Sequence, residues 1–443
     1  MRSICLTLPT NRPCAATIAA VGEEAAYAVE HFDNDVHLVI LDSCAPPVYA
    51  EHAEAVRRLP TSPRLTVHHL DEARQRDFLQ RVTERTGNAK PELLRDLLLP
   101  DGLSYGACTD RAFLLAAALG CESVHRRDSD SRYQSAHGRP VFPVHHELRS
   151  LGKRAADAAR GVDETTLATE HLDRRVAMVG SSFIGELSVD LGGILAADPE
   201  VYHDVVSLWA PAHWPAEQKR QLVDESFRGA GTRPFERDHS LLTLVDPMRV
   251  DMCNISFHGV HEQVPLPPAR DTIGSDYFLL HLVRNAGLPG VLHNRHIVNF
   301  HTSERRTGPG FLAYQTRFAK FLLSMLHFHF IYDGMAESGD SLLDDRGHIR
   351  ASAIAALARE SAPLDRRENV QRLDALDSAY RRLGGRYTTV ADQLATRRER
   401  LLDEARSDIE DFAVLTEAWG ELMSAARQTP LSPPPSGRPE VHG

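Results

Sequence analysis

Short apolar runs alternate with helical stretches through the first hundred residues, and this alternation restricts the fold more than any other feature of the chain. The runs at 4–8, 36–41 and 65–70 are strand-like, and residues 15–31 between the first two have helical composition. Strands that alternate with helices are joined by right-handed crossovers into a mostly parallel sheet. Ligands of such a sheet bind beyond the carboxyl ends of its strands, so the residues that follow each strand are the candidates for function.

The alternation continues further along the chain. Residues 103–120 have apolar positions at helical spacing, and residues 121–127 form a short possible strand. The polar stretch at 131–140 is typical of a loop, while 176–179 and 291–300 are again strand-like. We therefore expect an α/β fold, in which a mostly parallel sheet is flanked by helices.

The chain changes character near residue 341, where helix formers become continuous. One apolar stripe recurs there every three or four residues, at Val370, Leu373, Leu376, Tyr380 and Leu383. This spacing predicts an all-helical C-terminal region at 341–427, beside an α/β domain at 1–340. Residues 428–443 hold five prolines and few apolar side chains, so they are predicted to form a disordered tail.

The charge and the cysteines narrow the classes of partner and compartment. The chain carries 61 acidic against 50 basic side chains and thus lacks the basic surface that nucleic-acid binding requires. No run reaches the roughly 18 apolar residues of a membrane span. Six cysteines are scattered without a CxxC pair, as is usual for reduced thiols. We expect a cytoplasmic protein with no membrane span and no nucleic-acid partner.

The triplet Asp128-Ser129-Asp130 follows the possible strand at 121–127. Carboxylates at positions i and i+2 of an extended chain project to one side, where they can share one divalent cation. The same pattern occurs at Asp33-Asn34-Asp35, so the triplet alone does not establish a site. Whether Asp128 and Asp130 form a metal site therefore depends on the sequence around them.

Two segments near this triplet carry a family pattern. The first is Leu8-Pro9-Thr10-Asn11-Arg12-Pro13, and the second runs from Gly102 through a small-residue helix to Gly120, directly before the triplet. Together they resemble glycosyltransferases of the GT-A fold, most closely those of family 2. There, a Gly-rich turn, a helix that ends in Ala-x-Gly and a strand precede Asp-x-Asp. The resemblance covers residues 4–135.

The resemblance implies a GT-A (Rossmann-like) fold and assigns roles to residues of this chain. Asp42 closes the second strand, at the family position that contacts the nucleotide base, and Arg111 lies nine residues before Gly120, where the family has an arginine. The implied nucleotide-binding residues are Thr10, Arg12, Asp42, Arg111 and Asp128. The implied ligands of a Mn²⁺ or Mg²⁺ cofactor are Asp128, Asp130 and His301.

A later segment, Gly274-Ser275-Asp276-Tyr277-Phe278-Leu279, resembles the family's Gly-Glu-Asp-x-x-Leu. In the family an acid at this helix start is the general base toward the acceptor hydroxyl, which makes Asp276 the implied catalytic residue. The cation would stabilise the departing nucleoside diphosphate as a Lewis acid. The implied substrates are a nucleotide-sugar donor and an acceptor, a small molecule or a peptide, that the sequence does not identify.

Two alternatives remain open at this point. A sugar nucleotidyltransferase should carry a Gly-rich phosphate loop after its first strand, and residues 9–13 contain no glycine. A non-catalytic GT-A-like scaffold or binding protein is favoured by Ser275, which stands where the family has glutamate. It is also favoured by the polar stretch 122–127, because Arg126 and Arg127 need partners if that strand is buried.

Overall fold

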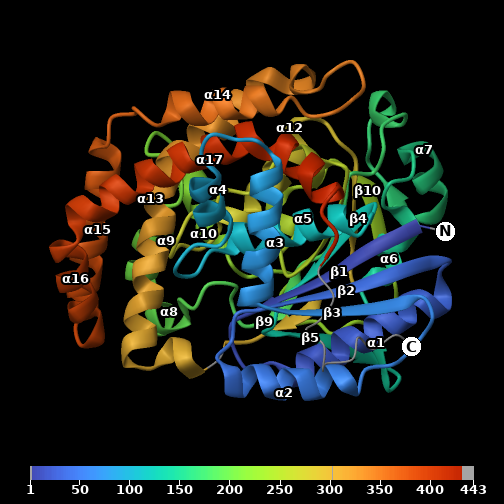
Figure 1. Ribbon diagram of the computed structural model, residues 1–443. Helices are drawn as coiled ribbons and strands as arrows, with labels where there is room; N and C mark the ends of the chain where they lie inside the picture. Colours follow the sequence, from blue (N-terminus) through green and yellow to red (C-terminus); the bar gives the residue numbers. More distant parts are fainter. Residues whose placement is uncertain (1, 302, 432–443) are drawn as a thin grey trace.

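The computed structural model describes residues 2–301 and 303–431, so most of the tail predicted at 428–443 lies outside the described residues. Its centre is a mixed nine-stranded sheet that helices flank (Figure 1). Across the sheet the strands are β3 (Leu65–Asp71), β2 (Asn34–Asp42), β1 (Arg2–Thr10), β4 (Ser123–Arg127), β11 (Asn254–His258), β8 (Met178–Gly180), β12 (Gly290–His293), β10 (Ser240–Thr243) and β7 (Glu164–Thr165). A smaller sheet contains β6 (Arg139–Val141), β5 (Ser131–Ala136), β13 (Ile297–Asn299) and β9 (Phe183–Gly185).

The helices cover both faces of the large sheet. They are α1 (Ala15–His31), α2 (Pro46–Arg57), α3 (Glu72–Arg85), α4 (Pro91–Leu98), α5 (Tyr105–Ala118), α6 (Val144–Ser150), α7 (Ala155–Ala158), α8 (Gly192–Ala197), α9 (Pro199–Ser207), α10 (Ala216–Glu225), α11 (Val260–Gln263), α12 (Phe278–Asn285), α13 (Gly308–Ser338), α14 (Ala351–Ser361), α15 (Arg367–Leu383), α16 (Arg386–Thr396) and α17 (Arg398–Arg427). On β1, Ile4 and Leu6 belong to one buried cluster and Cys5 to another. Successive side chains of a strand point to opposite faces, so both faces of β1 are buried.

The α/β fold is confirmed, and the sheet is mixed: among the described strands of the large sheet, five pairings are parallel and three are antiparallel. Strands β1 to β4 pair in parallel, whereas β11 runs antiparallel to both β4 and β8, and β10 runs antiparallel to β12. Apolar runs indicate that a segment is a strand but carry no information on its direction.

The order of the strands reverses between β1 and β4. The chain adds β2 and then β3 on one side of β1, and it then returns through α3, α4 and α5 to place β4 on the other side. Ligands of open α/β sheets bind in the crevice at such a switch point, beyond the carboxyl ends of the strands. The residues that follow Thr10 and Arg127 therefore face a natural binding crevice.

Two segments differ from the sequence-based expectation. Residues 131–140, expected as a loop, contain β5 and β6, which form an antiparallel hairpin. Only three positions of this hairpin are buried, Ser131, Gln134 and Val141, so its composition stays polar. Residues 291–300, expected as one strand, are split between β12 and β13 in different sheets, and the chain between them is held by the Nδ2 of Asn254, which donates to the carbonyl of Arg295 at 3.0 Å.

Buried ion pairs hold β4 in place despite its polar sequence. The guanidinium of Arg127 donates to both oxygens of Glu24 on α1, at 2.9 and 2.8 Å, and to Glu147 on α6 at 3.0 Å. All three side chains are buried. Each charged group therefore has a partner of opposite sign inside the protein, which offsets part of the cost of removing it from water.

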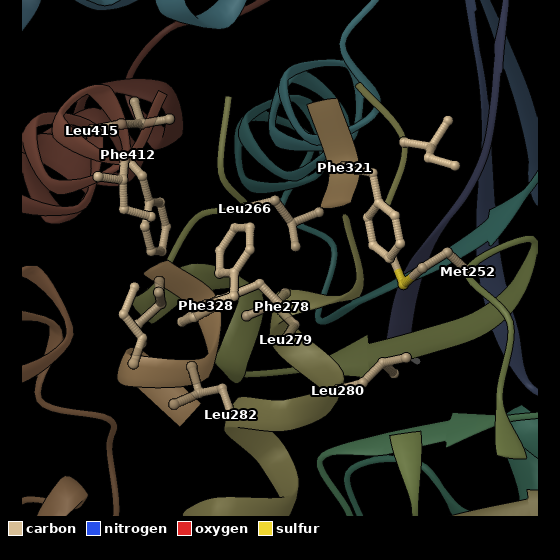
Figure 2. Close-up of a cluster of buried hydrophobic side chains, with 14 of the residues drawn as sticks. Met252, Leu266, Phe278, Leu279, Leu280, Leu282, Phe321, Phe328, Phe412 and Leu415 are labelled. Carbon is tan, nitrogen blue, oxygen red and sulfur yellow. The ribbon is translucent and has the colours of Figure 1, made fainter. Parts of the chain in front are cut away.

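The C-terminal helix α17, red in Figure 1, lies across α3, α4 and α5 and shares their hydrophobic core. Figure 2 shows Phe412 and Leu415 of α17 close to Phe278 of α12 and Phe328 of α13. The rings of Phe278 and Phe412 meet edge to face, with centroids 4.8 Å apart. The helical region at 341–427 thus packs on the sheet domain, and the boundary near residue 341 stays a prediction.

Within the described ranges, no helix combines the length and the hydropathy needed to span a membrane. The 31-residue α13 is long enough, but it carries Arg317 and Lys320. The Nζ of Lys320 lies 2.8 Å from Asp408 of α17. This helix is therefore a core element that contacts the C-terminal region.

We expect Phe412→Ala to destabilise the whole protein by about 3–5 kcal/mol, because it opens a cavity beneath α17. Glu421→Ala, at an exposed position of the same helix, should change stability by at most about 0.5 kcal/mol. Urea unfolding followed by circular dichroism measures both. A separate early transition that affects only part of the helical signal would show that α17 unfolds independently of the sheet.

Candidate active site

The turn after β1 brings the side chain of Arg12 to the crevice between the carboxyl ends of β1 and β4, where the strand order reverses. Thr10 Oγ1 donates to the carbonyl of Arg12 at 2.9 Å and accepts from the Arg12 N–H at 3.3 Å. This local bonding closes the turn. The guanidinium of Arg12 then donates to Asp130 Oδ2 at 2.8 Å. Of the residues expected at a nucleotide site, Arg12 therefore contacts the acidic triplet directly, and Thr10 holds the turn that positions Arg12.

Arginines surround the two acids that follow β4. Asp130 Oδ2 accepts from Arg12 and also from Arg305 Nη2, each at 2.8 Å. Asp128 Oδ1 lies 3.0 Å from Arg126 Nη2. Each carboxylate has a second oxygen besides the one these arginines contact.

Arg126 connects the triplet to the predicted general base. Its buried guanidinium donates through Nη1 to Asp276 Oδ2 at 2.6 Å, across 150 positions of sequence. The turn before Asp276 needs glycine, because Gly274 has φ +75° and a Cβ there would lie 2.8 Å from the ring of Phe321. The fold therefore brings Asp128 and Asp276 to the same guanidinium, that of Arg126.

Negative charge accumulates around Asp128. Burial is the main cause that raises the pKa of Asp128 to about 6, although the Arg126 guanidinium lowers it. Three nearby carboxylates raise it further, those of Asp130, Asp276 and Asp251. A raised carboxyl pKa means that the surroundings favour either a proton or an additional cation at this position.

Two cavities meet at the acidic triplet. The smaller has a volume of about 420 Å³ and a mostly polar wall that includes Thr10, Arg12 and Arg111. The larger has a volume of about 550 Å³, a mostly apolar wall, and Asp276 among its lining residues. The residues that line both cavities are Tyr105, Asp128, Asp130 and Arg305. The two acids therefore lie at the boundary between a polar and an apolar compartment.

His301 is buried close to this boundary, but both of its ring nitrogens have partners. Its Nε2 is 2.7 Å from the carbonyl of Leu187, to which it donates, so Nδ1 accepts from Arg305 Nη1 at 3.0 Å. Burial lowers the pKa of His301, which favours the neutral ring. Arg305 thus contacts two predicted metal ligands, Asp130 and His301, at the same time.

This contact bears on whether the residues fit a metal ion. Oxygen and imidazole donors suit a divalent cation such as Mn²⁺ or Mg²⁺. Asp130 and His301 accept from two different nitrogens of the Arg305 guanidinium. Among the described residues, Asp128, Asp130 and His301 do not form a group whose ligand atoms all lie within 4.8 Å of one another. The ligands therefore fit a cation in composition, and a cation bound by both would take the place of the Arg305 guanidinium.

Asp42 lies in a different environment from the one expected for a base contact. It is buried, and its Oδ2 is 2.7 Å from His52 Nδ1 and 2.8 Å from His69 Nε2. Although burial opposes it, hydrogen bonds from His69, His52 and Cys44 hold the pKa of Asp42 well below its usual range. Its neighbours Leu41 and Ser43, rather than Asp42, are among the described residues that line the smaller cavity.

Asp42, Cys44 and His52 could also hold an ion, since one ligand atom from each lies within 4.8 Å of the others. However, His52 Nε2 accepts from the N–H of Cys14 at 2.9 Å. The proton of a neutral His52 is therefore on Nδ1 and points to Asp42. This geometry is that of a hydrogen-bonded cluster.

Arg111 lies at the wall of the smaller cavity, and its guanidinium bonds to the protein. Nε donates to Gln75 Oε1 at 2.9 Å, and Nη1 donates to the carbonyl of Leu98. These contacts stabilise the junction of α3, α4 and α5. Its role toward a nucleotide stays a prediction.

Sequence reasoning missed several residues of this site. Arg305 and Asp251 belong to no motif, and Tyr277 was considered only as part of the segment around Asp276. The hydroxyl of Tyr277 donates to Asp251 Oδ2 at 2.7 Å, beside the predicted base. The one available signal was the arginine pair in the strand before the triplet, because Arg126 proves to be the bridge between Asp128 and Asp276.

Comparisons with known proteins add a family but no activity. A family model described as a family of unknown function (DUF6271) matches residues 2–434. No curated protein matches the chain. Among solved structures, a crystal structure described as that of a mycobacterial protein is similar over 73% of this chain and 74% of its own, with 16% identity and a TM-score of 0.34. A similarity of that size carries no argument about fold or function.

We expect Arg126→Met to cost about 3–5 kcal/mol of stability at pH 8, because it leaves buried carboxylates without their cation. Asp128 is charged above its pKa of about 6 and takes up a proton below it. The part of the cost that acts through Asp128 is therefore present at high pH and is lost as the pH falls through about 6. The total cost should be smaller at pH 5 by about 1 kcal/mol or more.

Urea unfolding at pH 8 and pH 5 measures this difference. Arg154→Met is the control, because Arg154 pairs with Asp173 where both side chains are mostly exposed, and its loss should cost less than about 1 kcal/mol at either pH. An equal cost of Arg126→Met at both pH values would contradict the coupling to Asp128.

Proposed function

The chain belongs to DUF6271, a family of unknown function, and we propose that it is a metal-dependent glycosyltransferase of GT-A type. One observation carries this proposal. Asp128 and Asp130 follow β4 at the switch point of the sheet, on the boundary between a polar and an apolar cavity. A transferase that joins a charged donor to a second substrate needs two such compartments with one reactive boundary.

The smaller cavity suits the nucleotide part of a nucleotide-sugar donor. It lies beyond the carboxyl ends of β1 and β4, where α/β sheets bind nucleotides. Arg12 and Arg305 line it, and guanidinium groups form paired hydrogen bonds with phosphate oxygens. Both arginines now contact Asp130, so a diphosphate would compete with that carboxylate for them.

Asp128 and Asp130 would hold Mn²⁺ or Mg²⁺, and His301 would join them once Arg305 has moved. A bound cation of this kind supplies Lewis-acid stabilisation of the negative charge that develops on the leaving diphosphate. Arg12 remains close enough to share that charge.

Asp276 would accept the proton of the acceptor hydroxyl from the side of the larger cavity. The acceptor oxygen forms a bond to the anomeric carbon while the bond from that carbon to the diphosphate oxygen breaks. Arg126 orients the Asp276 carboxylate through its 2.6 Å contact and keeps it beside the triplet. A positioned base of this type contributes typically about 10²–10⁴-fold to the rate.

A non-catalytic scaffold is the second candidate, and one observation favours it. Arg12, Arg126 and Arg305 already provide three positive charges next to Asp128, Asp130 and Asp276, so each of these acids has a cationic partner without a ligand. For either function we place the protein in the cytoplasm, because the six cysteines are unpaired, as is usual in reducing compartments.

A thermal-shift panel of nucleoside diphosphates and nucleotide-sugars, with and without Mn²⁺, tests the enzyme proposal. One nucleotide at about 100 times its Kd should add about 2.7 kcal/mol of stability and raise Tm by about 3 °C, and only with metal present. The double variant Asp128→Asn/Asp130→Asn should lose this shift.

The matched control is Asp33→Asn/Asp35→Asn, which changes the other Asp-x-Asp triplet of the chain and should keep the full shift. A panel that stays flat in the presence of Mn²⁺ would exclude the enzyme proposal. The non-catalytic scaffold would then be the better explanation for the cluster of Asp128 and Asp130.

A further inference from the structure

The larger cavity has the size and position of an acceptor site. Its volume of about 550 Å³ falls within the range of about 300–1,000 Å³ that is typical of small-molecule sites. Asp128, Asp130 and Asp276 line one part of it. A molecule that fills the cavity therefore reaches the predicted reaction centre with one of its groups.

Aromatic side chains form much of the wall. Trp209 stacks on Phe227 with ring centroids 5.3 Å apart at 13°, and it meets Phe321 at 5.6 Å. Tyr332 stacks on His281 at 3.8 Å and 9°. These flat surfaces favour a ligand with an apolar ring system, because aromatic faces stack on one another.

Trp214 extends this aromatic surface to solvent. It lines the cavity and is the one large hydrophobic side chain recorded as exposed in the part of the chain that the structure describes, at 36%. Because Trp214 lines the cavity and is also exposed, it lies where the cavity opens to solvent.

The charges of the wall oppose an anionic ligand. Among the described lining residues, seven are acidic: Asp128, Asp130, Glu225, Asp246, Asp251, Asp276 and Asp333. Two are arginines, and of these Arg305 is bound to Asp130 while Arg284 is exposed. A phosphate or carboxylate would be placed beside like charges, which costs binding energy.

Two of the three histidines in the wall, His281 and His329, do not offset this negative charge; the third, His213, is exposed. Burial lowers the pKa of His281 to about 4 and that of His329 to about 3. Both rings are therefore neutral at physiological pH and add no positive charge.

We propose that the larger cavity binds a flat, apolar hydroxyl compound, neutral or cationic, as the acceptor, and that it rejects acceptors with a phosphate or carboxylate. This inference rests on the proposed function, since it names the substrate that Asp276 would deprotonate. It narrows the acceptor from any small molecule or peptide to aromatic alcohols and phenols.

Tryptophan fluorescence tests the inference with two matched probes, 7-hydroxy-4-methylcoumarin and 7-hydroxycoumarin-4-acetic acid, which differ by one carboxylate. Of the three tryptophans, Trp209 and Trp214 line the cavity, whereas Trp419 is buried in α17. At pH 6.5, without metal or nucleotide, the neutral probe should quench part of the emission in a saturable way. The carboxylate probe should bind at least tenfold more weakly.

Two variants test whether the fluorescence quenching comes from binding in the larger cavity. Trp214→Phe changes an exposed side chain and should remove part of the quenching while the protein stays folded. The double variant Glu225→Lys/Asp333→Lys changes exposed acids of the wall and should reduce the difference between the two probes severalfold. Both positions are outside the predicted catalytic residues.

The outcomes separate this inference from the proposed function. If neither probe binds but the Mn²⁺-dependent nucleotide shift is present, the acceptor assignment is wrong and the enzyme proposal stands. If the carboxylate probe binds as tightly as the neutral one, the charge selectivity is wrong. If the neutral probe binds but no nucleotide does, the cavity is an apolar binding site and its role as acceptor site is overturned.

Discussion

Two adjacent buried arginines on β4 are the interaction on which the rest of the molecule depends. Strand geometry sends Arg126 and Arg127 to opposite faces of the sheet. Arg127 pairs with Glu24 and Glu147 and so joins β4 to α1 and α6. Arg126 pairs with Asp128 and with an acid from a distant segment. One short polar strand therefore anchors both the scaffold and the candidate site, and its charges tolerate burial only because each has a partner.

The strands that the sequence predicted best are those buried on both faces. β1 and β2 are rich in apolar residues and most of their positions are buried, as is typical of strands covered on both faces. The hairpin of β5 and β6 was missed because only three of its nine residues are buried, which gives it the composition of a loop. No strand was predicted at β11, and its antiparallel direction depends on where the chain returns to the sheet and not on the residues of the strand.

The same distinction holds for the site. Asp128, Asp130 and Arg12 meet in space because strand ends converge at a switch point, and that rule needs only the order of strands. The environment of Asp42 was not predictable, because the histidines that contact it come from a neighbouring strand and helix. Spacing identifies which residues approach one another but not which of their atoms already have partners.

The position of Arg305 has a thermodynamic consequence. In the structure its guanidinium contacts Asp130 and His301 together, so a cation that uses both ligands must first displace it. A diphosphate in the adjoining polar cavity offers the displaced group a new anionic partner. Cation and nucleotide would then each strengthen the binding of the other by the same factor, as reciprocity between linked sites requires. Under the proposed function, the metal would bind weakly alone and more tightly once the nucleotide is bound, so the substrate would promote binding of the cofactor.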